Sequence, residues 1–407
     1  MNDCDMRLDV ELGDTFRFGA MILIIGAVTR LGASIYLPAL PVIGAELSAD
    51  ASMMSQTLSV YFLVFALCTL VAGPLSDTLG RKAVLQSGML FFILGAILCA
   101  LARNYETLLL GRVIQALGAS MIPGTLMAMI RDASSDARVV SLTGWLAVLG
   151  GLLLVGAPLL GGILTHFFGW GSNFWFLALF SSLAWMASLF WMEETHPREA
   201  RLSFSIRAIF SRLGHMTISA EFILVMLPII AFFAVQGAFL AAAPYVMMKR
   251  YGFTPAQFGL SNAVIVLGIF SGRFIAVRLL KHRSAPSVYR LGGILSFFAV
   301  LLFCVMALGW FDNAAVFLII TGFYAALYGM LSPIGLKSAL TAFRTSAGTA
   351  ASLQGALLLG ASAMGSALTG LLAKSPLFSI HTAFALLSAL FCLTAAFSAL
   401  SARHRLK

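Results

Sequence analysis

Three arginines lie inside long apolar stretches of this sequence: Arg30, Arg112 and Arg273. A charged side chain at the centre of a lipid bilayer costs about 2.5 to 3.5 kcal/mol on insertion scales, so each guanidinium must reach water or polar partners. With a helix rise of about 1.5 Å per residue, Arg30 lies about 18 Å into its stretch. We therefore expect Arg30 to face a water-filled cavity and to contact substrate. The alternative is an arginine satisfied by backbone carbonyls and neighbouring polar side chains.

The acidic residues are distributed in the opposite way. All 16 lie in the N-terminal segment, in loops or near the ends of apolar stretches, so none is expected at mid-membrane. No carboxylate at the level of Arg30 can therefore pair with it. Asp132 and Glu221 remain as candidates for carrying a proton, although a helix-end charge in the interface is the simpler explanation of each.

Membrane helices must position these charges. The chain has 407 residues, 60% of them hydrophobic and 10% charged, whereas a soluble domain is about 25% charged. Lipid must cover most of its outer surface, and backbone groups in lipid are satisfied within helices. Twelve apolar runs are long enough to span a bilayer: 18–38, 53–74, 83–101, 107–129, 139–165, 174–192, 222–247, 256–279, 287–308, 314–336, 347–373 and 378–401.

One long polar and basic segment, from Glu193 to Glu221, divides these runs into two sets of six. This organisation is typical of a transporter with two helical bundles. We predict an all-α polytopic membrane protein of twelve transmembrane helices, with an N-terminal six-helix bundle (1–192), a central cytoplasmic linker (193–221) and a C-terminal six-helix bundle (222–407).

The placement of Lys and Arg predicts the orientation. With the N-terminus inside, nineteen of the 26 basic residues lie on the inner side, four lie on the outer side, and three lie within spans. We therefore expect a cell inner membrane protein with both termini in the cytoplasm. The net charge of +10 is then a topology signal, and nucleic-acid binding is not expected.

No enzyme signature accompanies the spans. The five cysteines and six histidines are dispersed without metal-ligand spacing, and the sequence has neither a Walker-type phosphate loop nor a His-Glu-x-x-His pattern. We expect no catalytic residues, no metal and no cofactor. The expected partners are a small-molecule substrate, protons and the lipid bilayer, and the chain is expected to be a monomer.

The loop between the second and third runs, GPLSDTLGRKAVL, places an acid four residues before an arginine. Asp77 can bond backbone N–H groups at a helix start or pair with Arg81, and such a pair is a candidate conformational switch. An ordinary solvated turn with basic anchors is an equal alternative. The string resembles the signature loop of the major facilitator superfamily, G-x-x-x-D-x-x-G-R-K, which falls on Gly73, Asp77, Gly80, Arg81 and Lys82.

A second resemblance lies in LLLGRVIQALGAS, which is similar to the fourth-helix motif of that superfamily, with Arg112, Gln115 and Gly118 in place. The resemblance implies that Arg112 takes part in proton movement. The alternative is a side chain that extends to the outer interface. Arg273 lies near the inner end of its span, and extension to the inner interface is the favoured explanation there.

A third resemblance lies in GGLLLVGAPLLGG, which is similar to the fifth-helix motif of proton-driven antiporters and implies export. It adds four candidate switch residues: Gly156, Pro158, Gly161 and Gly162. Small residues here allow close helix packing, and a proline can bend the helix.

Two further strings, IYLPALPVI and MIRDASSD, resemble the bicyclomycin- and chloramphenicol-resistance type of drug–proton antiporter. That type often carries an acid shortly before the Tyr-Leu-Pro stretch, where this sequence has Ser34. The difference speaks against a lipophilic cation as substrate. It also leaves the proton carrier open between Arg112 and Asp132.

We therefore expect proton-coupled export of small organic compounds, neutral or anionic, by alternating access. An exporter dedicated to an anionic metabolite such as a siderophore is the alternative, and uptake by proton symport is a third possibility. The resemblance implies a central cavity lined by the first, fourth, seventh and tenth spans. The candidate substrate-binding residues are Arg30, Ser34, Gln115, Gln236, Tyr324 and Tyr328.

Overall fold

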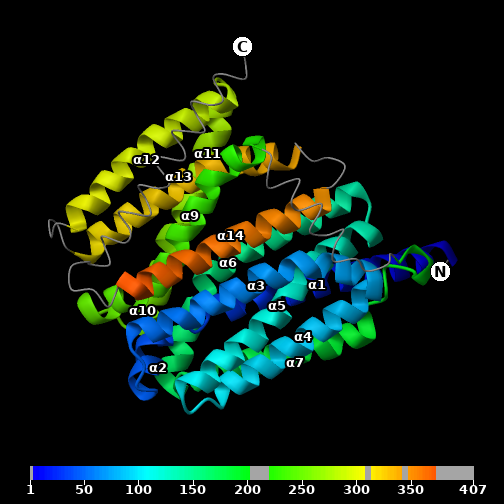
Figure 1. The fold of residues 1–407 in the computed structure, drawn as a ribbon. Helices are drawn as coiled ribbons and strands as arrows, with labels where there is room; N and C mark the ends of the chain where they lie inside the picture. Colours follow the sequence, from blue (N-terminus) through cyan, green and yellow to red (C-terminus); the bar gives the residue numbers. More distant parts are fainter. Residues whose placement is uncertain (1–2, 202–219, 308–312, 342–346, 373–407) are drawn as a thin grey trace.

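The computed structural model describes residues 3–201, 220–307, 313–341 and 347–372, and within these ranges the regular structure is entirely helical (Figure 1). The first part of the chain contains α1 Asp3–Ser34, η1 Leu37–Ala39, α2 Leu40–Glu46, α3 Ala51–Leu79, α4 Arg81–Ala100, α5 Tyr105–Ala133, α6 Asp136–Phe168, α7 Gly171–Trp191 and η2 Arg198–Ala200. The second part contains α9 Ala220–Tyr245, the π-helical turn η3 Val246–Arg250, α10 Pro255–Ser261, α11 Ala263–Leu280, α12 Ala285–Ala307, α13 Ala314–Thr341 and α14 Ala347–Leu372.

Eleven helical segments in the described residues are long and apolar enough to cross a membrane, and they coincide with the first eleven predicted runs. The predicted all-α polytopic membrane fold is thereby confirmed. The twelfth predicted run, 378–401, lies outside the described residues. We call the helices α1 to α7 the N-half and the helices α9 to α14 the C-half.

The second span is longer than predicted. The run was expected to end at residue 74, but α3 continues through Pro74 to Leu79, so Asp77 lies on a helix. The Oγ of Ser76 donates to the carbonyl of Gly73 at 2.8 Å, and Thr78 donates to the carbonyl of Pro74 at 3.0 Å. Pro74 has no N–H to donate to the carbonyl one turn earlier, and the helix continues past it without a break.

Polar side chains start several helices. Asp50 accepts a hydrogen bond from the N–H of Met53 at 2.7 Å at the start of α3, and Asn104 accepts one from Thr107 at 2.9 Å at the start of α5. Thr254 forms a capping box with Gln257 at the start of α10. These caps satisfy N–H groups that have no partner within their own helix.

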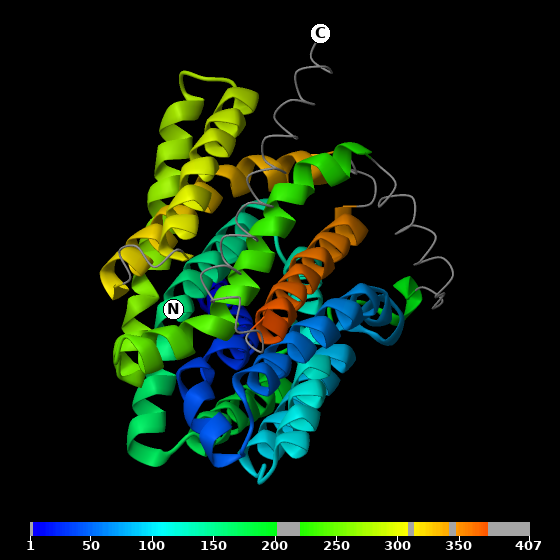
Figure 2. The ribbon, with the colours of Figure 1, turned by 60° about the vertical axis from the view of Figure 1, so that its left-hand side comes forward.

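The two halves meet at the end of the molecule that carries α2 and α10 (Figures 1 and 2). We call it the closed end. Ser55 of α3 donates to the carbonyl of Ser366 of α14 at 2.8 Å, and Ser366 donates to the carbonyl of Ser55 at 3.0 Å. The hydroxyl of Tyr245 donates to the carbonyl of Leu40 at 3.3 Å. Direct bonds to the backbone therefore join the halves here.

We call the opposite end, with the turn between α3 and α4, the linker end. The helices α3 and α14 still run side by side towards it, and a Cβ on Gly73 would lie 3.7 Å from the Oγ of Ser352. The helices α6 and α11 are less closely packed than α3 and α14. While α10 packs extensively against α6, the continuation α11 makes few contacts with it. The interface is thus looser on this side towards the linker end.

Candidate functional site

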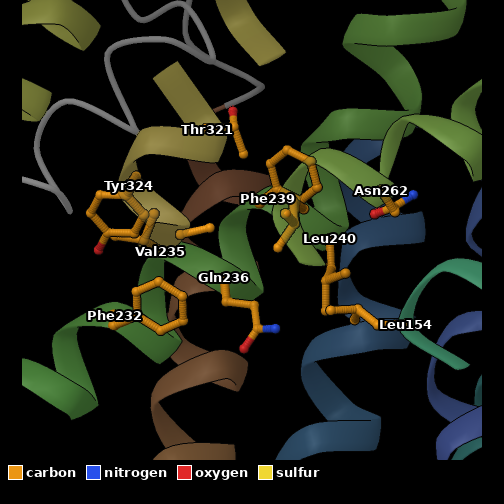
Figure 3. Close-up of a pocket in the computed structure, with 11 residues that line it drawn as sticks. Leu154, Phe232, Val235, Gln236, Phe239, Leu240, Asn262, Thr321 and Tyr324 are labelled. Carbon is orange, nitrogen blue, oxygen red and sulfur yellow. The ribbon is translucent and has the colours of Figure 1, made fainter. Parts of the chain in front are cut away.

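A pocket lies among α9, α11 and α13, and Gln236 and Tyr324 both line it (Figure 3). Its other polar side chains bond to their own helices: Asn262 donates to the carbonyl of Phe258 at 3.0 Å and Thr321 to that of Phe317 at 2.8 Å. Gln236 makes no hydrogen bond within the described part of the chain. Its amide is therefore available to a ligand.

The pocket is almost filled in this conformation. Its volume is about 30 Å³, which holds one or two water molecules, whereas sites for organic ligands measure about 300 to 1,000 Å³. Leu154 of α6 lines it together with C-half residues and lies beside Leu240 in Figure 3. A shift of α6 relative to the C-half would therefore change the room for a ligand.

Arg112 lies in a second group, among α1, α3 and α5. It is completely buried, with its guanidinium carbon 4.2 Å from the ring centroid of Tyr36 and 4.0 Å from that of Tyr61. It donates to the carbonyl of Gly32 at 3.0 Å and to the amide oxygen of Gln115 at 2.5 Å. Two aromatic faces and two neutral oxygens thus stabilise the charge, and among the described residues no carboxylate pairs with it.

The same contacts place Gln115 away from water. Its side chain is completely buried, and its oxygen is taken by Arg112. In this conformation Gln115 therefore orients Arg112 rather than facing the space between the halves. The burial of Arg112 also means that its side chain does not extend to an interface here.

The residues of the signature loop form a third group, at the linker end. Arg81 pairs with Asp77 one turn earlier and with Asp132 at the end of α5, where the Nε to Oδ2 distance is 3.1 Å. It also donates to the Oγ of Ser76 at 2.6 Å. All these partners belong to the N-half, so this ion-pair group does not join the two halves in the present conformation.

A residue that the sequence analysis did not single out completes this group. The carboxylate of Glu194, three residues after α7, accepts from the N–H of Arg81 at 2.9 Å and from the N–H of Lys82 at 3.2 Å. An anion at a helix N-terminus is stabilised by free N–H groups and the helix dipole. Arg201 lies 3.7 Å from the same carboxylate. The segment after α7 is thereby attached to the start of α4.

The turn between α3 and α4, beside Glu194, requires a glycine at position 80. Its φ of 103° lies in the left-handed region that favours glycine, and a Cβ there would overlap the carboxylate of Glu194. A sequence signal for Glu194 existed only in its position directly after an apolar run. Its partner, the first turn of α4, lies more than one hundred residues away and is fixed by the tertiary fold.

The fifth-helix motif lies on α6 at the closed end. A Cβ on Gly161 would overlap the carbonyl of Ile35 in α1's C-terminal turn, and one on Gly162 would lie 2.5 Å from the carbonyl of Pro255 in α10. The two glycines thus contact opposite halves of the molecule. Pro158 is buried within the helix, and Gly156 has open space around its Cβ position.

Arg30 lies apart from these groups, between the halves. Its side chain is exposed, although a Cβ on Gly150 of α6 would lie only 3.1 Å from its Nη1. It also interacts electrostatically with the hydroxyl of Tyr328 on α13. The Arg30 side chain is therefore accessible at the interface between the halves. Ser34 is buried, and its Oγ donates to the carbonyl of Arg30 at 3.0 Å, so it bonds to its own helix.

The structure therefore distributes the predicted residues over four places. Gln236 and Tyr324 share a pocket, Arg112 and Gln115 share a buried cluster, and Asp132 joins the signature loop. Arg30 and Tyr328 interact electrostatically across the halves, and Tyr328 stacks on Phe232 at a centroid distance of 3.8 Å. Phe232 lines the pocket, so the pocket and the Arg30 region adjoin. The backbone of Glu221 lies in α9, and its side chain is outside the described part.

Comparisons with known proteins agree with this architecture. A family model described as the Major Facilitator Superfamily matches residues 22–365. Multidrug resistance proteins MdtL of Escherichia fergusonii and Escherichia coli are 31% and 30% identical to this chain over 268 residues. Each match covers 60% of this chain, which thus spans 65% of the length of these relatives.

Solved structures show the same fold at low identity. The human organic anion transporter MFSD10 (TETRAN) has a TM-score of 0.66 at 18% identity, covering 94% of this chain and 99% of that one. A peptide transporter POT in complex with sulfate has a TM-score of 0.72 at 15% identity, covering 96% and 94%. A D-xylose–proton symporter has a TM-score of 0.68 at 12% identity, covering 95% and 96%.

Proposed function

This chain belongs to the major facilitator superfamily of membrane transporters, and we propose that it exports small organic compounds, neutral or anionic, in exchange for protons. The observation that carries this proposal is the difference between the two ends of the interface. The halves are bonded at the closed end, while α6 and α11 have few contacts towards the linker end, and Arg30 between them is exposed. One accessible end at a time is the requirement for alternating access.

The proposed orientation places the linker end and both termini in the cytoplasm of a bacterial inner membrane. The excess of Lys and Arg on that side supports it. We propose the domain division of the sequence analysis, with bundles at 1–192 and 222–407 and a cytoplasmic linker at 193–221. In this orientation the looser α6–α11 side of the interface faces the cytoplasm, from which an exported compound would be loaded.

The names of the Escherichia relatives support a drug-like substrate. An anionic metabolite such as a siderophore is the second candidate, because Arg30 is exposed between the halves and no acidic residue lies at its level in the sequence. The proposed substrate contacts are Gln236 and Tyr324 in the pocket and Arg30 and Tyr328 beside it. Ser34 would bond to the backbone carbonyl of Arg30, and Gln115 would orient the side chain of Arg112.

Proton coupling is assigned to Arg112 and Asp132 together. A guanidinium does not lose its proton in proteins, so Arg112 can only orient or stabilise neighbouring groups. Asp132 can take up a proton, and its partner Arg81 lies in the signature loop. Protonation of Asp132 would remove one ion pair from Arg81, which supplies a route from proton binding to the loop. Rearrangement of Gly73, Asp77, Gly80 and Lys82 with the four fifth-helix residues would then accompany the exchange.

Everted membrane vesicles containing the protein test this function. With an acidic lumen, we expect chloramphenicol to accumulate inside, and nigericin, which removes the pH gradient, to abolish the accumulation. Accumulation that is unaffected by nigericin would refute proton coupling. Accumulation only under the reversed gradient would indicate symport instead.

Asp132→Asn sharpens this test. We expect the variant to lose the dependence of transport on the pH gradient while it still binds substrate. The matched control is Asp136→Asn, four residues on at the start of α6, since Asp136 forms no ion pair with the described residues. Equal behaviour of the two variants would remove Asp132 from the coupling step.

A further inference from the structure

A second arginine lies on the opposite side of the space that Arg30 faces. Phe270 of α11 approaches α6 so closely that a Cβ on Gly151 would lie 3.5 Å from its ring. Arg273 is three residues further along α11 and therefore on nearly the same helix face. Gly150, the neighbour of Arg30, and Gly151, the neighbour of Phe270, are adjacent on α6. The two arginines thus approach the same stretch of α6 from different halves.

The hydroxyl of Tyr328 interacts electrostatically with Arg273 as well as with Arg30. Both arginines are exposed, and neither forms an ion pair or a guanidinium hydrogen bond within the described residues. The sequence places no acid at this depth. Two cations and one hydroxyl therefore lie near the same stretch of α6, and among the described residues no carboxylate pairs with either cation.

We propose that Arg30 and Arg273 form one anion-binding subsite, which holds the acidic group of an organic anion between the two halves. The carboxylate, sulfonate or phosphate of the ligand would accept hydrogen bonds from both guanidinium groups and from Tyr328. Its apolar body would contact Phe270, which is 49% exposed. This inference rests on the proposed function and identifies the subsite that would hold those of its substrates that are organic anions.

The subsite also has a consequence for the conformational change. Arg30 belongs to the N-half, and Arg273 and Tyr328 belong to the C-half. Without a ligand, the two positive charges repel each other and oppose closure of the linker end. A bound anion attracts both, so it stabilises the conformation in which they are close. A ligand shifts an equilibrium in this way only because it binds one state better.

The binding test uses the purified full-length protein in lipid nanodiscs with two probes of equal shape, phthalate and phthalamide. We expect phthalate to bind at least about tenfold more tightly, and Arg30→Gln and Arg273→Gln each to weaken its binding by about tenfold, as loss of a charge-assisted hydrogen bond predicts. Phthalamide binding should change little. Equal affinity for both probes, or unchanged phthalate binding in either variant, overturns the proposal.

Arg278→Gln is the matched control. Arg278 lies on the same helix and is exposed, but its guanidinium stacks 4.5 Å from the ring of Phe274 and is not near Tyr328 in any described contact. It should bind phthalate as the wild type does. A loss as large as that of Arg273→Gln would show a general charge effect and overturn the subsite. Unchanged melting temperatures of all three variants establish that they are folded.

A distance measurement tests the conformational part. With spin labels at Leu79 of α3 and Lys281 at the end of α11, phthalate should shorten the distance distribution in the wild type and leave it unchanged in Arg273→Gln. Shortening in both proteins would overturn the bridging by Arg273. Failure of the subsite is distinguishable from failure of the function. In the first case the wild-type protein would accumulate chloramphenicol under a pH gradient without binding phthalate more tightly than phthalamide. In the second case phthalate would bind without any gradient-driven transport.

Discussion

The two ends of the interface between the halves are stabilised by different chemistry. At the closed end, Ser55 and Ser366 exchange neutral hydrogen bonds across the halves, and the backbone of α6 touches that of α10. At the linker end, the described ion pairs are strong but lie within the N-half and the segment that follows α7. Charge therefore organises one half internally, whereas small residues and backbone contacts join the halves to each other.

This difference indicates where the N-half and the C-half can move apart. Neutral contacts between small residues are individually weak and need no charge to be desolvated when they part. A charged group that crossed the interface would be more costly to break. The contrast predicts that the closed end opens without a change in protonation. Conformational changes at the linker end are predicted to depend on the charge of its ion-pair residues.

The largest effect is expected from a cross-link across the closed end. In a background without the native cysteines, Ser55→Cys and Ser366→Cys joined by a short bifunctional methanethiosulfonate should stop vesicle accumulation of substrate, because the closed end can no longer open. Reduction with dithiothreitol should restore it. Each single substitution, treated in the same way, serves as control. Continued transport by the cross-linked protein would mean that this end does not open during the cycle.

A smaller effect is expected from Gly162→Val. Its added carbons would press on the carbonyl of Pro255, a backbone atom that cannot rotate away, so we expect a loss of stability of about 1–3 kcal/mol. The melting temperature of the purified protein measures it. Labelling of Ser366→Cys by a thiol reagent should rise as the closed end loosens. Gly156→Val is the control, since no atom lies within 4 Å of its Cβ position. A similar loss in the control would attribute the effect to helix propensity.

The smallest effect is expected at the linker end from Glu194→Ala. Removal of the carboxylate from the first turn of α4 should cost about 1 kcal/mol, the usual value for a helix cap. Amide hydrogen exchange at Arg81 and Lys82 should accelerate, while the closed end stays protected. The neighbouring Glu193→Ala removes an equally exposed charge that makes no described contact. If both variants exchange alike, the cap contributes nothing beyond net charge.

The fold could be predicted largely from the sequence because lipid leaves the backbone few choices. Apolar runs of sufficient length must be helices, and the eleven described spans follow from that condition alone. Helix ends were less predictable, as α3 shows: the apolar run ends at residue 74, but the helix continues through polar residues to Leu79.

The site could be predicted only in part, since residue type and depth do not specify partners. Arg30 and Arg112 were both recognisable as charges in apolar runs, yet one is exposed between the halves and the other is enclosed by Tyr36 and Tyr61. Nothing in the spacing distinguishes these environments, because the aromatic rings come from other helices. Arg273 was interpreted as a residue that extends to the interface, whereas Phe270, three residues before it on α11, approaches Gly151 in α6 of the other half.

The enclosure of Arg112 has a mechanical consequence. The contacts of Arg112 link α5 to Gly32 of α1, to Tyr36 just after α1 and to Tyr61 of α3, so these helices are expected to move together. The 33 residues of α6 extend about 50 Å, and a rotation of about 10° about Gly162 displaces Asp136 by about 7 Å. A small rotation of α6 at the closed end would thus produce a much larger displacement of its other end, at the linker end of the molecule.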